Sequence, residues 1–415
     1  MLAGWLSNYY IRDKKIFLSI LLSSIIILSI VTINNSAFYF RMASAQKSAG
    51  NNSPPYIGVN MRGLYTSGDQ LKNTVSGTLP KNYYEDSFRL ISQAGMNHVR
   101  YVFYWESYER NPSLFMNELM TMVNAADKWG VKVVYDNHQF HTSSWLNPDR
   151  GTGFPISLFK SKPLLYPYGA GGAPKYEAAK VWWTDWWNRS IKDTNGADGW
   201  TLQANFLKKI VNAVDKHPST LGYEILSEPH INSIDEWAKV GKFNTFMTDE
   251  LRKVTQKIIA YSQQVPASIN APKISVRPEN QAKMVPANNT NVVFKISLYG
   301  VPTDPYHEAR LAILVKAGKL AGVPLYVGEW NNVEREKSEG VFKINPKKSD
   351  ITQSEVNLFV QIFKKLNVWG WNYWQWNFQT NKSPNFNLIK LTENGTVQPT
   401  KYYEQLKNAV FDYYR

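Results

Sequence analysis

The 415-residue sequence contains no cysteine. Disulfide bonds and metal sites with thiolate ligands are therefore excluded, although this absence does not identify a cellular compartment. No glycine-rich phosphate loop follows the first predicted strand, which argues against a dinucleotide-binding fold. The six histidines form no HExxH or helical HxxxH pattern. Because His138 and His141 lack an evident third ligand, we expect no metal and no other cofactor.

Charge and repeats exclude further classes of protein. No short repeat is present, which argues against a solenoid or a propeller. The formal net charge is +14, but no block of like charge dominates the chain beyond its N-terminal segment. A surface of this kind is mildly basic and carries no nucleic-acid footprint. Aromatic residues make up 14% of the chain, so most must belong to a core, while some could stack on sugar rings.

The N-terminal segment predicts export. Residues 16–33 are an uncharged apolar run of eighteen residues, preceded by Arg12, Lys14 and Lys15. This length fits both a membrane span and a long signal-peptide core. A small-residue Ala-Ser-Ala site at 43–45 lies well beyond the run, so a retained anchor and a cleaved signal both stay open. In either case we expect the rest of the chain outside, on the outer face of the cell membrane or secreted.

Three regions follow from this pattern. Residues 1–41 hold the cytoplasmic flank and the apolar segment, and residues 42–55 are small and polar like a linker. From residue 56 to residue 415, strand and helix patterns alternate. Eight such units suit an α/β fold, the (β/α)8 or TIM barrel, with a doubly wound open sheet as the alternative. We expect a monomer.

The predicted elements and the longest insertion can be placed on the chain. The insertion at 139–201 contains four tryptophans in VWWTDWWNRS, which either line substrate subsites or form a buried helix face. The predicted strands are 56–64, 98–105, 131–138, 220–228, 273–277, 292–299, 324–330 and 368–376. The predicted helices are 83–94, 114–129, 202–217, 235–262, 306–321, 354–366 and 400–415.

Two glutamates close predicted strands. Glu228 ends the fourth strand in GYEILSEPH, where we expect Pro229 to keep it extended. Glu329 ends the seventh strand in LYVGEW. Because the strand ends of such a barrel surround one mouth, both carboxylates can enter the same cleft. A pair about 5–5.5 Å apart is typical of retaining glycosidases, while ordinary salt bridges at strand ends are the alternative.

Other strand ends add polar and aromatic candidates. Arg100 lies inside the second strand, an expensive position unless an acid pairs with it, and a structural ion pair is the alternative. His138 closes the third strand and Tyr299 closes the sixth. Alternate residues of a strand face inward, so at least one tryptophan of the eighth strand should floor the cleft. The candidates there are Trp371, Trp374 and Trp376.

In this order, the motifs HVR, VVYDNH, ILSEP, ISLY, LYVGEW and YWQW resemble glycoside hydrolase family 5, the cellulase family of clan A, over residues 56–380. The resemblance implies a retaining endo-β-glycosidase with Glu228 as acid/base and Glu329 as nucleophile. It implies a β-1,4-linked polysaccharide or oligosaccharide as substrate, such as cellulose, mixed-linkage glucan, mannan or xyloglucan. The supporting or substrate-binding residues that it assigns are Arg100, His138, Ser227, Tyr299 and Trp374.

Two positions depart from the family pattern. Ser227 stands where the family has the asparagine before the acid/base, and Ser297 stands where it has histidine. The shorter serine weakens a sugar contact worth about 1–3 kcal/mol, or about ten- to a hundredfold in rate. We expect an active enzyme, in which Ser227→Asn preserves or raises turnover. The alternatives are a non-catalytic carbohydrate-binding barrel and a glycosidase acting on glycolipids or envelope glycans.

Overall fold

The computed structural model contains a closed barrel of eight β-strands within Tyr56–Arg415. The apolar segment at 16–33 lies outside the described residues. Within the part of the chain that is described, no helix combines the length and the apolar character needed to cross a membrane. The described residues are 55–67, 79–148, 151–169, 173–233, 235–263, 282–299, 305–331, 335–338, 341–344, 352–377, 387–392 and 395–414.

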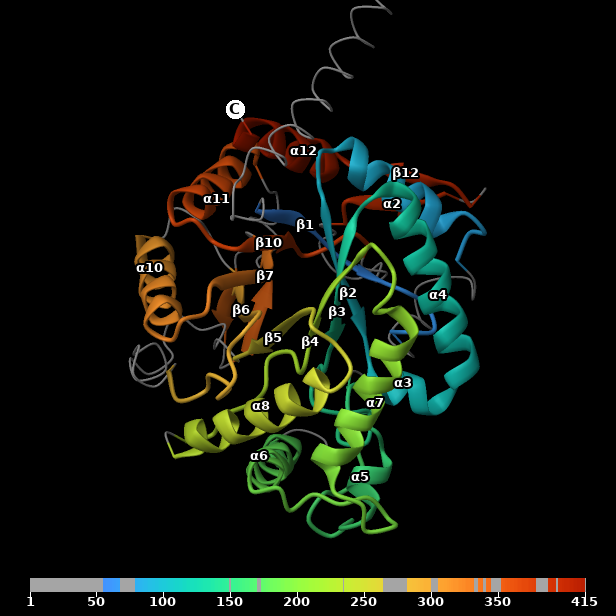
Figure 1. The fold of residues 1–415 in the computed structure, drawn as a ribbon, viewed down its shortest axis with the longest axis vertical. Helices are drawn as coiled ribbons and strands as arrows, with labels where there is room; N and C mark the ends of the chain where they lie inside the picture. Colours follow the sequence, from blue (N-terminus) through green and yellow to red (C-terminus); the bar gives the residue numbers. More distant parts are fainter. Residues whose placement is uncertain are drawn as a thin grey trace, which may run out of the picture. The chain divides into compact units, whose positions relative to one another are not determined.

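The predicted (β/α)8 barrel is confirmed. Eight strands close into a barrel in the order β1-β10-β7-β6-β5-β4-β3-β2, and every neighbouring pair is parallel (Figure 1). Strands covered on both faces read as nearly continuous apolar runs, as in VVFKISLY. The barrel strands are β1 (Tyr56–Arg62), β2 (His98–Phe103), β3 (Lys132–Asn137), β4 (Thr220–Glu224), β5 (Ile258–Ser262), β6 (Val292–Tyr299), β7 (Leu325–Asn331) and β10 (Gly370–Tyr373).

Helices surround the strands (Figure 1). One helix shows how local chemistry sets the boundaries: the Asn111 side chain accepts from the Leu114 N–H, Pro112 follows it, and the helix ends at Gly130 with φ 65°. The helices are α2 (Tyr83–Gln93), α3 (Trp105–Arg110), α4 (Pro112–Trp129), α5 (Ser157–Lys160), α6 (Ala173–Trp187), α7 (Gly199–Val214), α8 (Glu236–Arg252), α10 (Pro305–Leu320), α11 (Gln353–Lys365) and α12 (Lys401–Tyr414).

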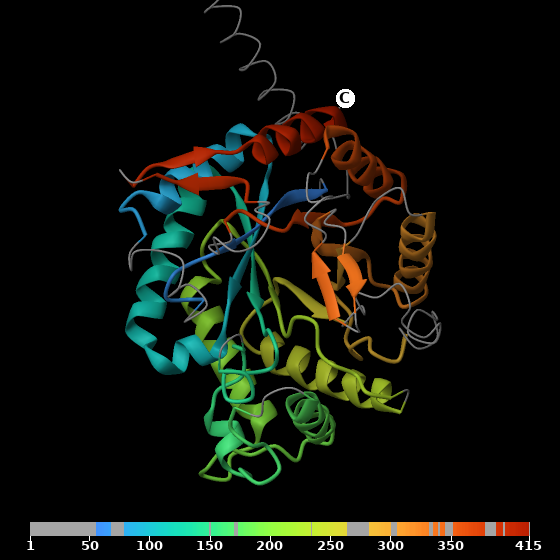
Figure 2. The same cartoon turned by 180° about the vertical axis from the view of Figure 1, so that it is seen from behind.

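Two small antiparallel sheets accompany the barrel. One pairs β8 (Arg335–Ser338) with β9 (Val341–Ile344), directly after the seventh barrel strand. The other pairs β11 (Ile389–Leu391) with β12 (Val397–Pro399), and β12 contacts both α2 and α12 (Figure 2). The second sheet therefore follows the last barrel strand and leads the chain into its C-terminal helix.

The fifth strand corrects a prediction. Helix α8 ends at Arg252 and β5 occupies Ile258–Ser262, whereas the sequence predicts one continuous helix over 235–262. The five residues between them, KVTQK, include neither glycine nor proline, so apolar periodicity alone misses the change from helix to strand. The strand predicted at 273–277 lies outside the described residues.

The tryptophans of α6 belong to the core. All four are buried and contact the phenylalanines Phe154, Phe159 and Phe243 from other segments. The insertion after β3 is therefore packed by aromatic side chains against α8, and these four indoles do not serve as sugar-binding surfaces. The four residues are Trp182, Trp183, Trp186 and Trp187.

Candidate active site

Arg100 of β2 organises the barrel interior. Its side chain is fully buried, and all five of its N–H donors have an acceptor. Burial opposes the charge, but three surrounding carboxylates outweigh this cost and raise the pKa of Arg100 well above its usual value. The acceptors are Glu224 Oε2 at 2.7 Å, Asn60 Oδ1 and Asp136 Oδ2 at 2.8 Å, Glu329 Oε1 at 2.9 Å and Ser227 Oγ at 3.0 Å.

Lys295 of β6 adds a second buried cation. Its Nζ donates to Ser297 Oγ at 2.9 Å, to Glu329 Oε1 at 3.0 Å and to Ser227 Oγ at 3.1 Å. Burial and the nearby Arg100 both oppose its charge. The surrounding glutamates nevertheless raise the pKa of Lys295, so the group is an ammonium in the folded protein.

Glu329 of β7 lies between these cations. Its Oε1 accepts from Arg100 and Lys295, and its Oε2 accepts from Tyr299 Oη at 2.6 Å. Burial alone would raise the pKa of Glu329, but Lys295 and Arg100 dominate and hold it far below its ordinary value. Glu329 is therefore a carboxylate at neutral pH.

Glu228 lies four residues beyond the end of β4, in a conformation that differs from the extended one predicted. Its φ is 45°, in the left-handed region that residues other than glycine rarely adopt. Its N–H donates to Ser262 Oγ at 3.2 Å, and its carbonyl accepts from Gln139 Nε2 at 2.9 Å. These bonds hold a strained backbone of the kind that clusters at functional sites.

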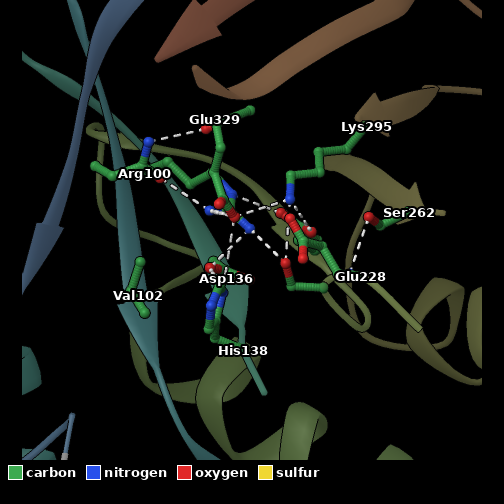
Figure 3. Close-up of polar contacts among 12 residues, drawn as sticks. Arg100, Val102, Asp136, His138, Glu228, Ser262, Lys295 and Glu329 are labelled. Carbon is green, nitrogen blue, oxygen red and sulfur yellow. Dashed lines mark hydrogen bonds and ion pairs between the residues drawn. The ribbon is translucent and has the colours of Figure 1, made fainter. Parts of the chain in front are cut away.

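The two predicted catalytic glutamates share one electrostatic environment. Glu228 is half-buried, and its charge, like that of Glu329, contributes to the raised pKa of Lys295. Figure 3 shows the Lys295 side chain reaching toward both glutamates. Among the residues that the structure describes, the Glu228 carboxylate forms no salt bridge, so one glutamate is buried and tightly paired while the other is open.

His138 and Trp374 extend the site beyond the glutamates. His138 Nδ1 lies 2.8 Å from Asp136 Oδ2, and its ring stacks on Trp374 with 5.7 Å between centroids. Trp374 is half-buried and carries the Arg62 guanidinium 4.7 Å from its ring centroid. The other two candidates, Trp371 and Trp376, are buried, as expected if only one of the three indoles faces the cleft. Trp374 therefore offers the aromatic surface of this site.

One acidic cluster has the composition of a metal site. Asp136, His138 and Glu329 each offer a ligand atom within 4.8 Å of the others. The Arg100 guanidinium already pairs with Asp136 Oδ2 and Glu329 Oε1, and Lys295 lies on the same oxygen of Glu329. A metal ion bound here would be repelled by the charges of Arg100 and Lys295. The cluster is therefore better suited to these two side chains than to a metal.

Ser227 and Ser297 both lie in this network. Ser227 is fully buried, and its Oγ accepts from both Arg100 and Lys295. Ser297 accepts from the same ammonium. Both serines therefore hold a cation of the protein, which the sequence resemblance does not assign to them.

Three residues of the site escaped the sequence analysis: Asn60, Glu224 and Lys295. Asn60 and Lys295 are polar residues inside largely apolar strands, and Glu224 is the last residue of β4. Lys295, Ser297 and Tyr299 alternate along β6 and all reach the Glu329 network, so the period of two was a usable signal. The position of Glu224 two residues after Gly222 in GYE offered a similar signal.

Comparison with known proteins identifies the family of this chain. The model for "Cellulase (glycosyl hydrolase family 5)" matches residues 58–380, which is most of the chain. The chain belongs to glycosyl hydrolase family 5. The family match includes every residue of the cluster around Arg100, Glu228 and Glu329.

The relatives within family 5 include enzymes named for glycolipids. An endoglycoceramidase of Hydra vulgaris is 25% identical over 170 residues, covering 36% of this chain and 33% of that protein. The match thus spans about a third of that relative. A solved endogalactoceramidase is 16% identical with a TM-score of 0.61, covering 86% of this chain and 81% of the other.

Two further solved structures show the same fold. Endo-glycoceramidase II from Rhodococcus sp., solved as a lactosyl-enzyme intermediate, is 17% identical with a TM-score of 0.61 and covers 86% of this chain and 78% of its own. An endoglucanase from Pseudomonas stutzeri is 14% identical with a TM-score of 0.55 and covers 86% and 95%. The barrel is thus shared by proteins with different named substrates.

Proposed function

We propose that this protein is a retaining endo-β-glycosidase, with Glu329 as nucleophile and Glu228 as general acid and base. The observation that carries the proposal is the Glu329 carboxylate, buried and kept anionic by Arg100, Lys295 and Tyr299. A nucleophile must be ionised before the substrate arrives, and this surrounding meets that condition. A non-catalytic barrel would have no need to hold a carboxylate ionised at its mouth.

The first step breaks the glycosidic bond. An oxygen of Glu329 attacks the anomeric carbon and forms a glycosyl ester, while Glu228 gives its proton to the departing oxygen. In the second step Glu228, now a carboxylate, takes a proton from water, and the resulting hydroxide equivalent attacks the anomeric carbon and releases Glu329. Two displacements leave the sugar with its original anomeric configuration. The Rhodococcus neighbour, solved as a lactosyl-enzyme intermediate, supports this chemistry by analogy.

We further propose a glycolipid as the preferred substrate, cut between the glycan and its lipid. The names of the Hydra relative and of two structural neighbours support this choice. Exposed apolar side chains of the segment between β3 and β4 also support it, because a polysaccharide needs no such surface. They are Phe140, Ile156, Leu164, Leu165 and Tyr168, with Leu164 97% exposed. The β-1,4-linked polysaccharide predicted from the sequence is the second candidate, supported by the endoglucanase neighbour.

The stereochemistry tests the mechanism directly. The full chain is incubated with an aryl β-lactoside, and the first-formed anomer is followed by proton NMR before mutarotation. Release of the β-anomer supports the double displacement, whereas release of the α-anomer contradicts it. A 2-deoxy-2-fluoro β-lactosyl fluoride should add one glycosyl group to the protein, and peptide mapping should place that group on Glu329.

The substrate is tested by comparing lipid and polymer. The wild-type chain and Glu329→Gln are incubated with vesicles containing a β-lactosyl lipid, and in parallel with cellulose, mixed-linkage glucan, mannan and xyloglucan. Release of intact lactose by the wild type alone supports the glycolipid proposal. Reducing ends from a polymer with an unchanged glycolipid would select the polysaccharide instead.

The cellular location stays a proposal. We propose that residues 16–33 direct export and that the barrel acts on the outer face of the cell membrane or is secreted. A glycolipid substrate suits this location because its headgroup lies at the membrane surface. Mass spectrometry of the native N-terminus distinguishes the two forms: an intact N-terminus supports the anchor, and a new N-terminus after residue 45 supports cleavage.

A further inference from the structure

Lys295 is fully buried inside the barrel, and its ammonium group is fully hydrogen-bonded. Its side chain is 0% exposed, and each of the three protons of its ammonium has its own acceptor. A fourth oxygen, Oε1 of Glu224, lies 3.7 Å from Nζ. Burying a lysine costs several kcal/mol unless such partners are present, so this position is built around the ammonium.

The neighbours of Lys295 are small. Both hydroxyl partners are serines, Ser227 and Ser297, at the two positions where the family pattern has asparagine and histidine. The third neighbour is Gly328, where an added Cβ would lie 2.7 Å from both Cγ and Cε of Lys295. These three small residues therefore leave room for the Lys295 side chain to extend from β6 to the carboxylate of Glu329.

We propose that Lys295 is the positioning residue of the nucleophile, and that Ser227 and Ser297 are adapted to it. One ammonium would then take the place of the amide and imidazole side chains that the family pattern puts at 227 and 297. This inference depends on the proposed role of Glu329 and adds a residue to it. The two serines then help Lys295 to position the nucleophile, and their small size does not imply a loss of activity.

The contacts also assign different roles to the two oxygens of Glu329. Oε1 accepts from two cations, Arg100 and Lys295, whereas among the described residues Oε2 accepts only from the neutral Tyr299. Cationic donors withdraw more electron density from an oxygen than a phenol does. Lys295 would thus fix Oε1 and leave Oε2 as the oxygen that attacks the anomeric carbon.

The role of Lys295 reverses the effect on turnover that we expect for Ser227→Asn. From the sequence alone, Ser227→Asn should preserve or raise turnover. In the structure, Ser227 Oγ is fully buried and accepts from both Arg100 and Lys295, so a larger amide must displace one of them. We therefore expect Ser227→Asn to lower kcat when Lys295 is present.

The first experiment removes the charge with Lys295→Met in the full chain. The probe is 2,4-dinitrophenyl β-lactoside, whose leaving group needs no proton, so the rate of the first step reports on the nucleophile. We expect kcat to fall about 10- to 100-fold with little change in KM. The acid limb of the pH profile should move up by about 1–3 pH units, because a cation beside Glu329 is lost. A merely structural lysine would leave this limb in place.

A chemical rescue separates charge from folding. The sequence has no cysteine, so Lys295→Cys introduces a single thiol. Alkylation with 2-bromoethylamine in denaturant, followed by refolding, rebuilds an ammonium of nearly the original length. The wild type treated identically is the control, since it has no thiol to modify. Recovery of kcat and of the wild-type acid limb supports the inference, while refolded protein that stays impaired contradicts it.

A mutant cycle tests the adaptation of the serines. We expect Ser227→Asn with Ser297→His to be damaging beside Lys295 and less damaging beside Lys295→Met, since the larger groups then have room. Strictly additive losses would overturn the adaptation. If the wild type neither turns over the aryl lactoside nor is trapped on Glu329, the proposed function itself fails. An active wild type with an unchanged acid limb in Lys295→Met overturns only the role of Lys295.

Discussion

The two proposed catalytic carboxylates, Glu228 and Glu329, should differ sharply in what their loss does to stability. Replacing Glu329 by glutamine keeps its size but removes the counter-charge of Arg100 and Lys295, both fully buried. Removing one partner of a buried ion pair costs about 3–5 kcal/mol. We expect the lower end, about 3 kcal/mol, because Glu224 and Asp136 still face these cations. In a unit of this size that loss lowers Tm by about 4 °C.

Glu228→Gln is the matched control. Glu228 is half-buried, and among the described residues its carboxylate forms no salt bridge. The same chemical change there should cost less than about 1 kcal/mol. Both variants should lose turnover of substrates with poor leaving groups. Only Glu228→Gln should keep substantial activity in the first step on the dinitrophenyl lactoside, because that step needs no acid.

The assay is thermal unfolding of both variants beside wild type, repeated across pH. The pKa of Glu329 is depressed in the folded protein, so its ion pairs contribute their stability above the ordinary carboxylate pKa and lose it as the pH falls. The deficit of Glu329→Gln should therefore be constant above about pH 5 and shrink in acid. A Glu329→Gln variant as stable as Glu228→Gln at pH 7 would refute the claim that two cations depend on this carboxylate.

Three further substitutions test other parts of the site. Tyr299→Phe removes the 2.6 Å bond to Glu329 and should lower kcat about 10- to 100-fold on the aryl lactoside, with KM unchanged; a KM effect alone would contradict this. Trp374→Ala removes the half-exposed aromatic surface and should raise KM for oligosaccharides about tenfold, as initial rates would show. Leu164→Ser with Leu165→Ser should lower turnover of vesicle-bound glycolipid several-fold and leave the aryl lactoside unaffected; equal rates on vesicles would argue against lipid contact.

Sequence reasoning succeeded where a physical rule links neighbours along the chain. Continuous apolar runs that end on a polar residue located seven of the eight barrel strands, since strands covered on both faces must be apolar throughout. Most predicted helix ends lie within a few residues of the observed ones, because the apolar residues of a helix recur with a period of about 3.6. The fifth strand failed because the helix before it ends without a glycine or a proline, and Glu228 adopts a backbone conformation that Pro229 disfavours.

The site was harder to predict because its energetics depend on residues far apart in sequence. Arg100 could be recognised as a buried charge, yet its five acceptors come from four different segments of the chain. From the sequence, Ser227 and Ser297 predict a weaker sugar contact, because each is compared with the larger residue of the family pattern. Lys295, which gives both serines a partner, lies on β6, and only closure of the barrel brings it beside Ser227.

The charges inside the barrel also explain why Glu329 is the stronger acid. Two cations, Arg100 and Lys295, face the carboxyl groups of Asp136, Glu224 and Glu329, so full ionisation would leave one excess negative charge. Burial raises the pKa of Glu224 despite both cations, and its Oε1 makes no hydrogen bond in the described structure. That oxygen can carry the proton that balances the cluster. A proton held there would leave both cations to stabilise the carboxylate of Glu329, the proposed nucleophile.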